Sequence, residues 1–346
     1  MDNINARPNL LKQANLSLIR NVIKANHTAT RAEIVRETKI SSTTVRSLLS
    51  EMLQSNEIES IGYDESSGGR KAERYRFKPG RYYCAAFCVT DSGVITLLVN
   101  VCGEIVETEK LEMKDGDFES VISSSLDQLT AEKEIKSIGI GISGVVDGNS
   151  YWKKNMEDEE LYQINIGDVL TKRYKIPVVL ENDLNAAAAG FQRCYEQNFP
   201  QENPEQTNMA YLHFGHGCIS AGFIAGGRVI RGSHNYAGEL GLLPSEDGKT
   251  LDSCMKDTMP DTQYIHLSVN IISWICGILN PGYVALTGPA VRESCLAYMN
   301  DVLHSLLPSP MAAELLYSPD MLHDYLNGMA YLTSLKMFEE VQFVKE

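Results

Sequence analysis

The stretch Thr30–Leu53 constrains the fold most, because its residue pattern predicts two short helices joined by a tight turn. Thr30 and Glu33 have the spacing of a capping box, which marks the start of a helix. The segment Thr38–Ile40 then interrupts the pattern, and Ser41 or Ser42 caps a second helix. The apolar residues of this second helix recur three and four positions apart, at Val45, Leu48, Leu49, Met52 and Leu53.

The other face of the second helix, about Ser42–Leu53, starts with hydroxyl groups and one guanidinium group and carries no acid there. Such side chains approach phosphates and base edges closely, whereas acidic side chains are repelled. We therefore predict DNA contacts from Ser42, Thr43, Thr44, Arg46 and Ser47. A pair of ordinary packed helices would share the apolar pattern, so the flanking segments have to decide between the two interpretations.

The flanks favour a winged helix-turn-helix over residues 1–80. An apolar face between Leu16 and Ile23 predicts a preceding helix, and Ile58–Tyr63 and Tyr75–Phe77 predict two strands. The loop between the strands carries Arg70 and Lys71, which we expect to contact phosphates or the minor groove. Arg74 and Arg76 add positive charge to the return strand.

The charge is divided unevenly along the chain. The net charge is −14, yet residues 1–80 hold 13 basic and 9 acidic side chains. The remaining 18 basic and 36 acidic side chains give the rest of the chain a charge of −18. A basic N-terminus on an acidic body restricts phosphate contact to the N-terminal part.

The cysteines and the hydropathy indicate a cytoplasmic protein. None of the 8 cysteines forms a C-x-x-C pair, and the first residues show no signal-peptide pattern. No apolar run of membrane-spanning length occurs in the sequence. We expect free thiols in a reducing compartment and no membrane partner.

Beyond residue 80, strand-like and helix-like segments alternate, which is typical of an α/β fold. The polar segment Gln197–Gln206 is the expected excursion between two lobes. Among the expected helices are Leu161–Tyr174, Val291–Leu307 and a closing helix at Tyr325–Lys345.

Five segments together resemble the ROK family of repressors, open reading frames and sugar kinases, and more narrowly its transcriptional-repressor branch. They occur in family order, as SSGGRKAERYRFKPG, IGIGISGVVDG, VVLENDLNAAAAG, AGFIAGGRVIRGSHNYAGELG and LNPGYVALTGPAV. The resemblance implies a two-lobed, actin-like body behind the winged helix-turn-helix. We expect lobe I over residues 81–197 with the C-terminal helix at about 325–346, and lobe II over residues 198–324. It also implies a homodimer or homotetramer that binds palindromic operators.

The resemblance also shows where a kinase would need its phosphate loops. The family's Asp, Gly and Thr of the first loop fall on Cys88, Thr90 and Ser92. The first loop therefore lacks both a ligand for Mg²⁺ and a glycine beside the phosphates. The second loop, G-T-G in the family, falls on His216-Gly217-Cys218, or after a shift of one residue on Gly215-His216-Gly217, which keeps the glycines but loses the Thr. We therefore expect no ATP binding and no kinase activity.

The sugar site of the family is partly present. Asn182 and Asp183 match the family's Asn-Asp pair and Glu239 matches its sugar-binding Glu, although the pair could equally cap the following helix, and Glu239 could be a solvated acid. The family's zinc-binding His is replaced by Leu242. Cys254 alone cannot replace the cysteine-rich zinc loop, so we predict no zinc or other cofactor.

The sequence therefore predicts a transcriptional regulator, in the repressor mode, of carbohydrate-related genes, whose DNA affinity responds to a sugar or sugar derivative held between the lobes. Two alternatives stay open. One is a sugar kinase that tolerates altered phosphate loops, and the other is a DNA-binding dimer without a small-molecule effector.

Overall fold

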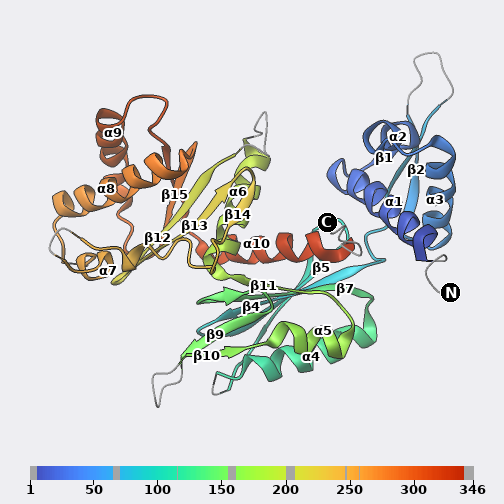
Figure 1. Ribbon diagram of the computed structural model, residues 1–346, viewed down its shortest axis with the longest axis horizontal. Helices are drawn as coiled ribbons and strands as arrows, with labels where there is room; N and C mark the ends of the chain where they lie inside the picture. Colours follow the sequence, from blue (N-terminus) through green and yellow to red (C-terminus); the bar gives the residue numbers. More distant parts are fainter. Residues whose placement is uncertain are drawn as a thin grey trace.

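The computed structural model describes residues 6–64, 71–114, 116–154, 161–199, 207–245, 248–256 and 258–338. The N-terminal unit (Ala6–Phe77, blue in Figure 1) lies to one side of two larger units, each built on a β-sheet. We call the sheet unit with β4 and β7 lobe I and the sheet unit with β12 and β15 lobe II.

The N-terminal unit packs α1 (Ala6–Ala25), α2 (Arg31–Thr38) and α3 (Ser42–Gln54) against an antiparallel sheet. The sheet has strand order β1-β3-β2, from Ala29–Thr30, Glu73–Phe77 and Ile58–Tyr63.

The predicted start of α2 and the predicted bounds of α3 are confirmed to within a residue. Thr30 and Glu33 form the capping box of α2, and Lys39 ends that helix in the left-handed conformation. Ser41 then caps α3 by accepting a hydrogen bond from the backbone N–H of Thr44. Because Ile34 and Val45 are fully buried, α2 and α3 hold one relative orientation.

Lobe I has strand order β11-β7-β4-β5-β6, from Val178–Asn182, Ile135–Ile142, Tyr83–Thr90, Gly93–Asn100 and Ile105–Leu111. Helices α4 (Phe118–Glu132) and α5 (Ile166–Tyr174) cover one face (Figure 1). The alternation along β4 explains the two faces: Phe87 packs with the core under α4, whereas Cys84 and Cys88 join the core on the other face. A small three-stranded antiparallel sheet of β8 (Val146–Asp147), β9 (Ser150–Lys154) and β10 (Leu161–Ile164) also belongs to this lobe.

Lobe II has strand order β14-β13-β12-β15-β16, from Arg228–Ile230, Cys218–Ala225, Met209–Gly215, Tyr283–Thr287 and Glu314–Tyr317. Helices α8 (Asp261–Leu279) and α9 (Leu296–Leu306) pack on one face, and α6 (Asp183–Asn198) contacts the other face. Along β12, Leu212 belongs to the core under α8, whereas Tyr211 belongs to the core shared with α6.

Helix α8 is the one helix of the described residues that is long and apolar enough to cross a membrane by length and composition. Its residues Val269, Ile272 and Ile275 are buried in the core of lobe II. The core helix of a globular domain has this same composition, so hydropathy alone does not decide between the two settings.

Helix α10 (Met321–Leu335, red in Figure 1) crosses α6 between the two sheets. The crossing is close because both helices carry glycine at the contact. A Cβ atom on Gly328 would lie 1.7 Å from the carbonyl oxygen of Ala186, and one on Gly190 would lie 1.9 Å from the carbonyl oxygen of Asp324. Any larger residue at these positions would therefore push the two helices apart.

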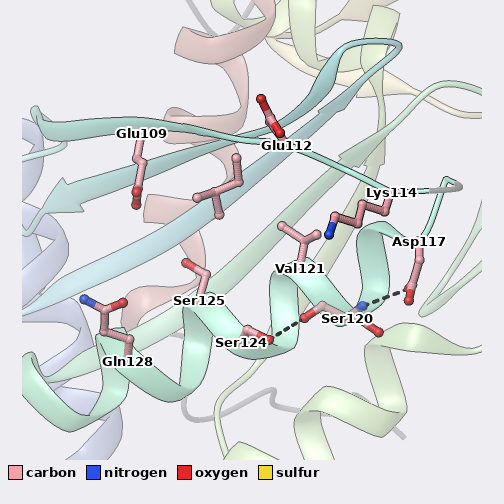
Figure 2. Close-up of a pocket in the computed structure, with 10 residues that line it drawn as sticks. Glu109, Glu112, Lys114, Asp117, Ser120, Val121, Ser124, Ser125 and Gln128 are labelled. Atoms are coloured by element: carbon pink, nitrogen blue, oxygen red, sulfur yellow. Dashed lines mark hydrogen bonds between the residues drawn. The ribbon is translucent and has the colours of Figure 1, made fainter.

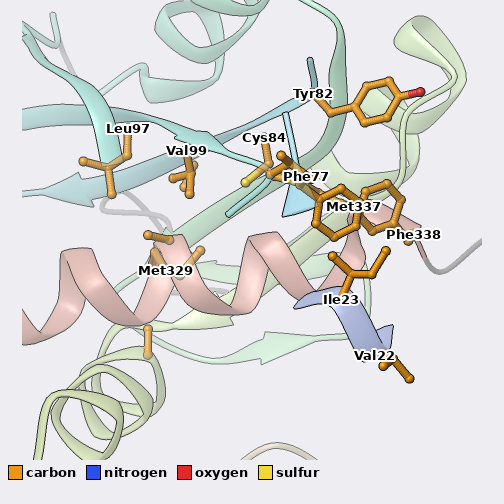
Figure 3. Packing of buried hydrophobic residues seen from close by; sticks show 14 of the residues in the cluster. Val22, Ile23, Phe77, Tyr82, Cys84, Leu97, Val99, Met329, Met337 and Phe338 are labelled. Carbon is orange, nitrogen blue, oxygen red and sulfur yellow. The ribbon is translucent and has the colours of Figure 1, made fainter. Parts of the chain in front are cut away.

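The end of α10 also contacts the N-terminal unit. The short helix η4 (Lys336–Phe338) places Phe338 against Phe77 of β3, with stacked rings 5.6 Å apart. The guanidinium of Arg20 lies 4.8 Å from the centre of the Phe338 ring, and the Ser17 hydroxyl donates to the Phe338 carbonyl oxygen at 3.1 Å. Figure 3 shows Ile23, Phe77 and Phe338 gathered at this junction.

Three expected helices have different bounds. Residues 161–164 form β10, because they pair with β9 in the small antiparallel sheet. Within the expected helix Leu161–Tyr174, only Ile166–Tyr174 is helical. The helix expected from Val291 begins at Leu296 as α9, after the short 3-10 helix η3 (Glu293–Cys295). The closing helix begins earlier than expected, at Met321 with Asp320 as its cap, and its α-helical part ends at Leu335.

We predict that Gly328→Ala lowers the free energy of unfolding by about 1–3 kcal/mol, because the added methyl group overlaps the Ala186 carbonyl. Urea unfolding followed by circular dichroism measures this loss. Gly277→Ala is the matched control, since a Cβ there meets only the Met311 methyl group at 3.8 Å. It should leave stability unchanged or raise it by up to about 1 kcal/mol, and equal losses in both variants would contradict a close crossing.

Candidate functional site

The exposed face of α3 carries the predicted DNA-contacting residues. Ser42, Thr43, Arg46 and Ser47 are exposed, and Thr44 is half-buried because its hydroxyl lies 2.8 Å from that of Ser41. The first turn of α3 has no acidic residue. Among the described residues, Arg46 has neither an ion-pair partner nor a hydrogen-bond partner for its side chain. Its guanidinium is therefore available to an external anion or base edge.

The predicted positive charge of the β2–β3 loop is only partly available. Lys71 is exposed, whereas Arg70 lies outside the described residues. Arg74 binds both Asp64 (2.8 Å) and Glu33 (3.1 Å), and Arg76 binds Glu59 at 2.7 Å. These arginines hold β3 against its neighbours, and their positive charge is neutralised within the unit. The expectation that they add free positive charge to the return strand is therefore wrong.

The second group of predicted residues lies at one edge of the lobe I sheet. Strands β4, β7 and β11 run parallel, so their carboxyl ends meet there. Ser143 follows β7, and Asn182 and Asp183 lie at the junction of β11 with α6. Ligands of open α/β sheets bind outside the carboxyl ends of strands, which makes this edge a candidate ligand site.

Asn182 acts as the cap of α6. Its side-chain oxygen accepts hydrogen bonds from the backbone N–H groups of Leu184 (2.9 Å) and Asn185 (3.1 Å). Its side-chain nitrogen donates to the Gly144 carbonyl oxygen at 2.9 Å. Asn182 therefore caps α6, as the capping interpretation proposed. Its side-chain amide keeps one N–H that could donate to a ligand.

Asp183 has the electrostatic character of a buried acid. Burial raises its pKa to about 6, while hydrogen bonds from the Leu184 N–H and from the Ser143 side chain oppose the rise. The negative charge of Glu239 adds to the rise. A carboxyl group in this state can accept or donate a hydrogen bond near neutral pH, as a sugar hydroxyl requires.

Glu239 approaches from lobe II, and sequence reasoning missed its neighbour Asp252. Glu239 is in contact with solvent, yet desolvation of part of its side chain, followed by the charge of Asp252, raises its pKa. Asp252 lies on the short helix α7 (Leu251–Cys254), and its Oδ1 accepts a 2.7 Å hydrogen bond from the Ile219 N–H. It also packs against Gly241, where a Cβ would lie 1.8 Å from Asp252 Oδ1. No sequence motif pointed to Asp252, because it lies in the segment where the family's zinc loop would be and where this chain departs from the family pattern.

Two polar contacts link lobe I with the loop that carries Glu239. Arg231 of that loop forms an ion pair with Glu181 of β11, whose side chain is 2% exposed, and its Nε lies 3.0 Å from Glu181 Oε2. Asn235 donates to Asp147 of β8 at 3.1 Å. These contacts fix the loop in front of Asp183.

A pocket of about 460 Å³ lies beside Ser143 in lobe I and is lined by Thr90, Tyr151 and Trp152, among others. A separate groove of about 500 Å³ lies between β6 and α4 (Figure 2) and is lined by Glu109, Lys114, Asp117 and Gln128, among others. None of the predicted site residues lines this groove. The pocket beside Ser143 adjoins the predicted site, because the Ser143 side chain forms a hydrogen bond with Asp183.

The residue at the family's Asp position of the first phosphate loop is buried, whereas Thr90 is half-buried and Ser92 is exposed. Cys88 is fully buried in β4, and Tyr325 of α10 lies against Gly141 of β7, where a Cβ would meet the Tyr325 hydroxyl at 2.3 Å. Burial raises the pKa of Tyr325 well above its usual value, with further contributions from Cys88 and Asp183. Among the described residues, no three His, Cys, Asp or Glu side chains gather as a metal site, and the absence of zinc stays a prediction.

Asp183→Asn should raise the free energy of unfolding near pH 7.5 by about 1–3 kcal/mol, because it removes a buried charge. The folded-state pKa of Asp183 is raised to about 6 from 3.8, so its protonated form stabilises the fold at low pH, and this contribution is lost as pH rises through about 6. The difference between variant and wild type should therefore nearly vanish at about pH 4. Urea unfolding across this pH range measures it, with Asp301→Asn on the exposed side of α9 as control. A difference that does not change with pH would contradict the raised pKa.

Comparisons with known proteins find similarity over much of the chain. Residues 91–257 match the family described as the ROK family. Over 254 residues the chain is 27% identical to a putative xylose repressor of Caldicellulosiruptor sp. (strain Rt8B.4), a match that covers 71% of this chain and 62% of that protein. A xylose repressor of Bacillus subtilis (strain 168) is 23% identical over 70% of this chain and 64% of its own length. The chain thus spans a little over three fifths of the length of these relatives.

Solved structures show the same fold. A ROK family transcriptional regulator, a homologue of the E. coli MLC protein, matches with a TM-score of 0.72 and 16% identity, over 95% of this chain and 97% of that chain. A ROK family protein from Streptococcus pneumoniae TIGR4 in complex with sucrose matches with a TM-score of 0.56 and 16% identity, over 73% of this chain and 98% of that chain. Residues 91–257 are therefore similar to the ROK family, and the mixed α/β fold of the chain is that of solved ROK proteins.

Proposed function

We propose that the protein is a DNA-binding transcriptional repressor whose affinity for its operator is controlled by a sugar bound between lobes I and II. The observation that carries this proposal is the combination of two separate surfaces. One is the face of α3 that carries Arg46, which has no side-chain partner among the described residues, and the other is the pair of acids Asp183 and Glu239, whose charges interact across the two lobes. The xylose-repressor names of the relatives support a pentose as the first sugar to test.

In this proposal residues 1–80 are a winged helix-turn-helix, with α3 in the major groove and the β2–β3 loop, including Arg70 and Lys71, near the backbone or minor groove. Residues 81–197 with the C-terminal helix form one lobe, and residues 198–324 form the other. Two copies of the chain, or four, would place two α3 helices on the half-sites of a palindromic operator. We place the protein in the cytoplasm, where its DNA lies.

The effector would bind Asp183 and Glu239 directly, with Asn182 holding the start of α6. Because these acids come from different lobes, a sugar that hydrogen-bonds to both stabilises the closed arrangement. Helix α10 packs on α6, β4 and β7, and η4 at its end contacts the N-terminal unit through Phe338. A change at Asp183 and Glu239 can therefore reach the N-terminal unit through packed side chains.

The residues at the phosphate-loop positions argue against kinase activity. With the buried Cys88 at the family's Asp position, a carboxylate ligand for Mg²⁺ is missing from β4, which supports the expectation of no kinase activity. Release of ADP in the presence of hexoses or pentoses, abolished by Asp183→Asn, would favour the kinase alternative.

Arg46→Ala should weaken binding to the preferred operator by about 1–3 kcal/mol, because it removes one charged contact from the recognition helix. The operator is first selected from random DNA with the wild-type protein, and affinities are then measured by fluorescence anisotropy at fixed salt. Lys172→Ala, which removes an exposed charge from α5 in lobe I, is the control and should bind as the wild type does. Equal affinities for wild type and Arg46→Ala would contradict the role of α3.

Effector binding should change the fluorescence of Trp152, which lines the pocket beside Ser143. The chain has 2 tryptophans, so the variant Trp274→Phe leaves Trp152 as the reporter. We expect a saturable change with D-xylose or another sugar of a hexose and pentose panel, and loss of that change in Asp183→Ala. Glu112→Ala, an exposed acid on the groove of Figure 2, is the control. A flat response to every sugar, with DNA binding intact, would favour a repressor without a small-molecule effector.

A further inference from the structure

A second pocket, distinct from the sugar cleft, lies where the N-terminal unit meets the body. It has a volume of about 310 Å³ and is lined by α1, by the turn that contains Cys102 and Gly103, and by helices α6 and α10. Small-molecule sites often lie at interfaces between domains and have volumes that begin near this size.

The pocket is cationic. Lys24 of α1 and Arg193 of α6 both line it, and no acidic residue lines it, although the whole chain has a net charge of −14. Among the described residues, neither cation forms an ion pair with a carboxylate. Lys24 donates instead to the Ser334 carbonyl oxygen at 2.6 Å and lies 3.3 Å from the Ser334 hydroxyl. Arg193 lies over the ring of Tyr331, 4.8 Å from its centre.

Two acids line adjoining pockets, and both already have partners. Glu104 lines one of them and accepts a 2.7 Å hydrogen bond from the Asn100 amide. Glu196 lines another and accepts a 2.9 Å hydrogen bond from the Gln192 amide.

Burial lowers the pKa of Lys24 to about 8, and the positive charge of Arg193 acts in the same direction. Two positive charges held close together in a partly buried pocket repel each other, and a bound anion would relieve that repulsion.

We propose that this pocket binds the phosphate group of a small phosphorylated metabolite, with Lys24 and Arg193 as its charged ligands and Tyr331 as an apolar wall. A lysine ammonium and an arginine guanidinium together suit a tetrahedral oxyanion, because both donate charge-assisted hydrogen bonds. The volume leaves room for a small organic group beside the phosphate. Since Lys24 belongs to the N-terminal unit and Arg193 to the body, the ligand would hold the two together independently of the sugar cleft.

The test is isothermal titration of the full-length protein with inorganic phosphate and with glycerol 3-phosphate at constant ionic strength, with glycerol as the uncharged match. We expect saturable binding of the phosphate-bearing probes and none of glycerol. Tighter binding of glycerol 3-phosphate than of inorganic phosphate identifies a phosphorylated metabolite as the ligand class, and the reverse order identifies free phosphate and overturns that assignment.

Arg193→Gln should weaken binding at least about tenfold, because a charge-assisted hydrogen bond is lost. Lys110→Gln, which removes an exposed positive charge from β6, should bind as the wild type does. Lys24→Arg keeps the positive charge and should retain binding. This variant distinguishes an effect of charge from a disruption of the packing between the N-terminal unit and the body. Arg193→Gln should also keep the Trp152 response to sugar, so failure of this site is distinguishable from failure of the sugar cleft.

Three results would overturn the proposal: no saturation at low-millimolar probe, equal weakening by Lys110→Gln, or weaker operator binding by Arg193→Gln without any binding of the small probes. The last result would mean that the two cations contact DNA phosphates instead.

Discussion

The contact between α6 and α10 is the interaction on which the rest of the body depends. Gly190 and Gly328 bring the two backbones so close that each helix limits the position of the other. Helix α6 starts at the ligand edge of lobe I and packs on the lobe II sheet, while α10 packs on β4 and β7 of lobe I. Because each helix contacts elements of both lobes or their shared core, the lobes cannot shift without a change at this crossing.

The same pair of helices also positions both sites. The cap residue of α6, Asn182, precedes Asp183 directly, so the geometry of the acid is set by the start of the helix. At the far end of α10, Phe338 packs against Phe77 and Arg20 of the N-terminal unit. The start of α6 with Asp183, the N-terminal unit and the junction pocket with Lys24 and Arg193 therefore share one packed scaffold. This continuity is a physical route for coupling between them, and the variants described above test it.

Features that depend on neighbours in sequence could be predicted well, and features that depend on distant partners could not. The capping box at Thr30 and the apolar spacing of α3 are local, and both were predicted correctly. The ion pairs of Arg74 with Asp64 and Glu33 depend on strand pairing, so its charge was wrongly counted as free. Asp252 enters the site because α7 folds back toward Ile219, which no short pattern encodes. For Asn182, sequence left two roles open, and the hydrogen bonds place its oxygen on the α6 backbone.

The length of α10 limits how the cleft can influence the N-terminal unit. From Tyr325 to Leu335 the helix rises about 15 Å, so tilting it by about 5° as a rigid rod would move its far end by only about 1 Å. Such a small displacement cannot by itself change the distance between two DNA-binding helices enough to alter operator binding. It is, however, large enough to separate the stacked rings of Phe77 and Phe338. A sugar signal that travels along this helix would therefore act as a release of the N-terminal unit, with the aromatic stack as the contact that opens.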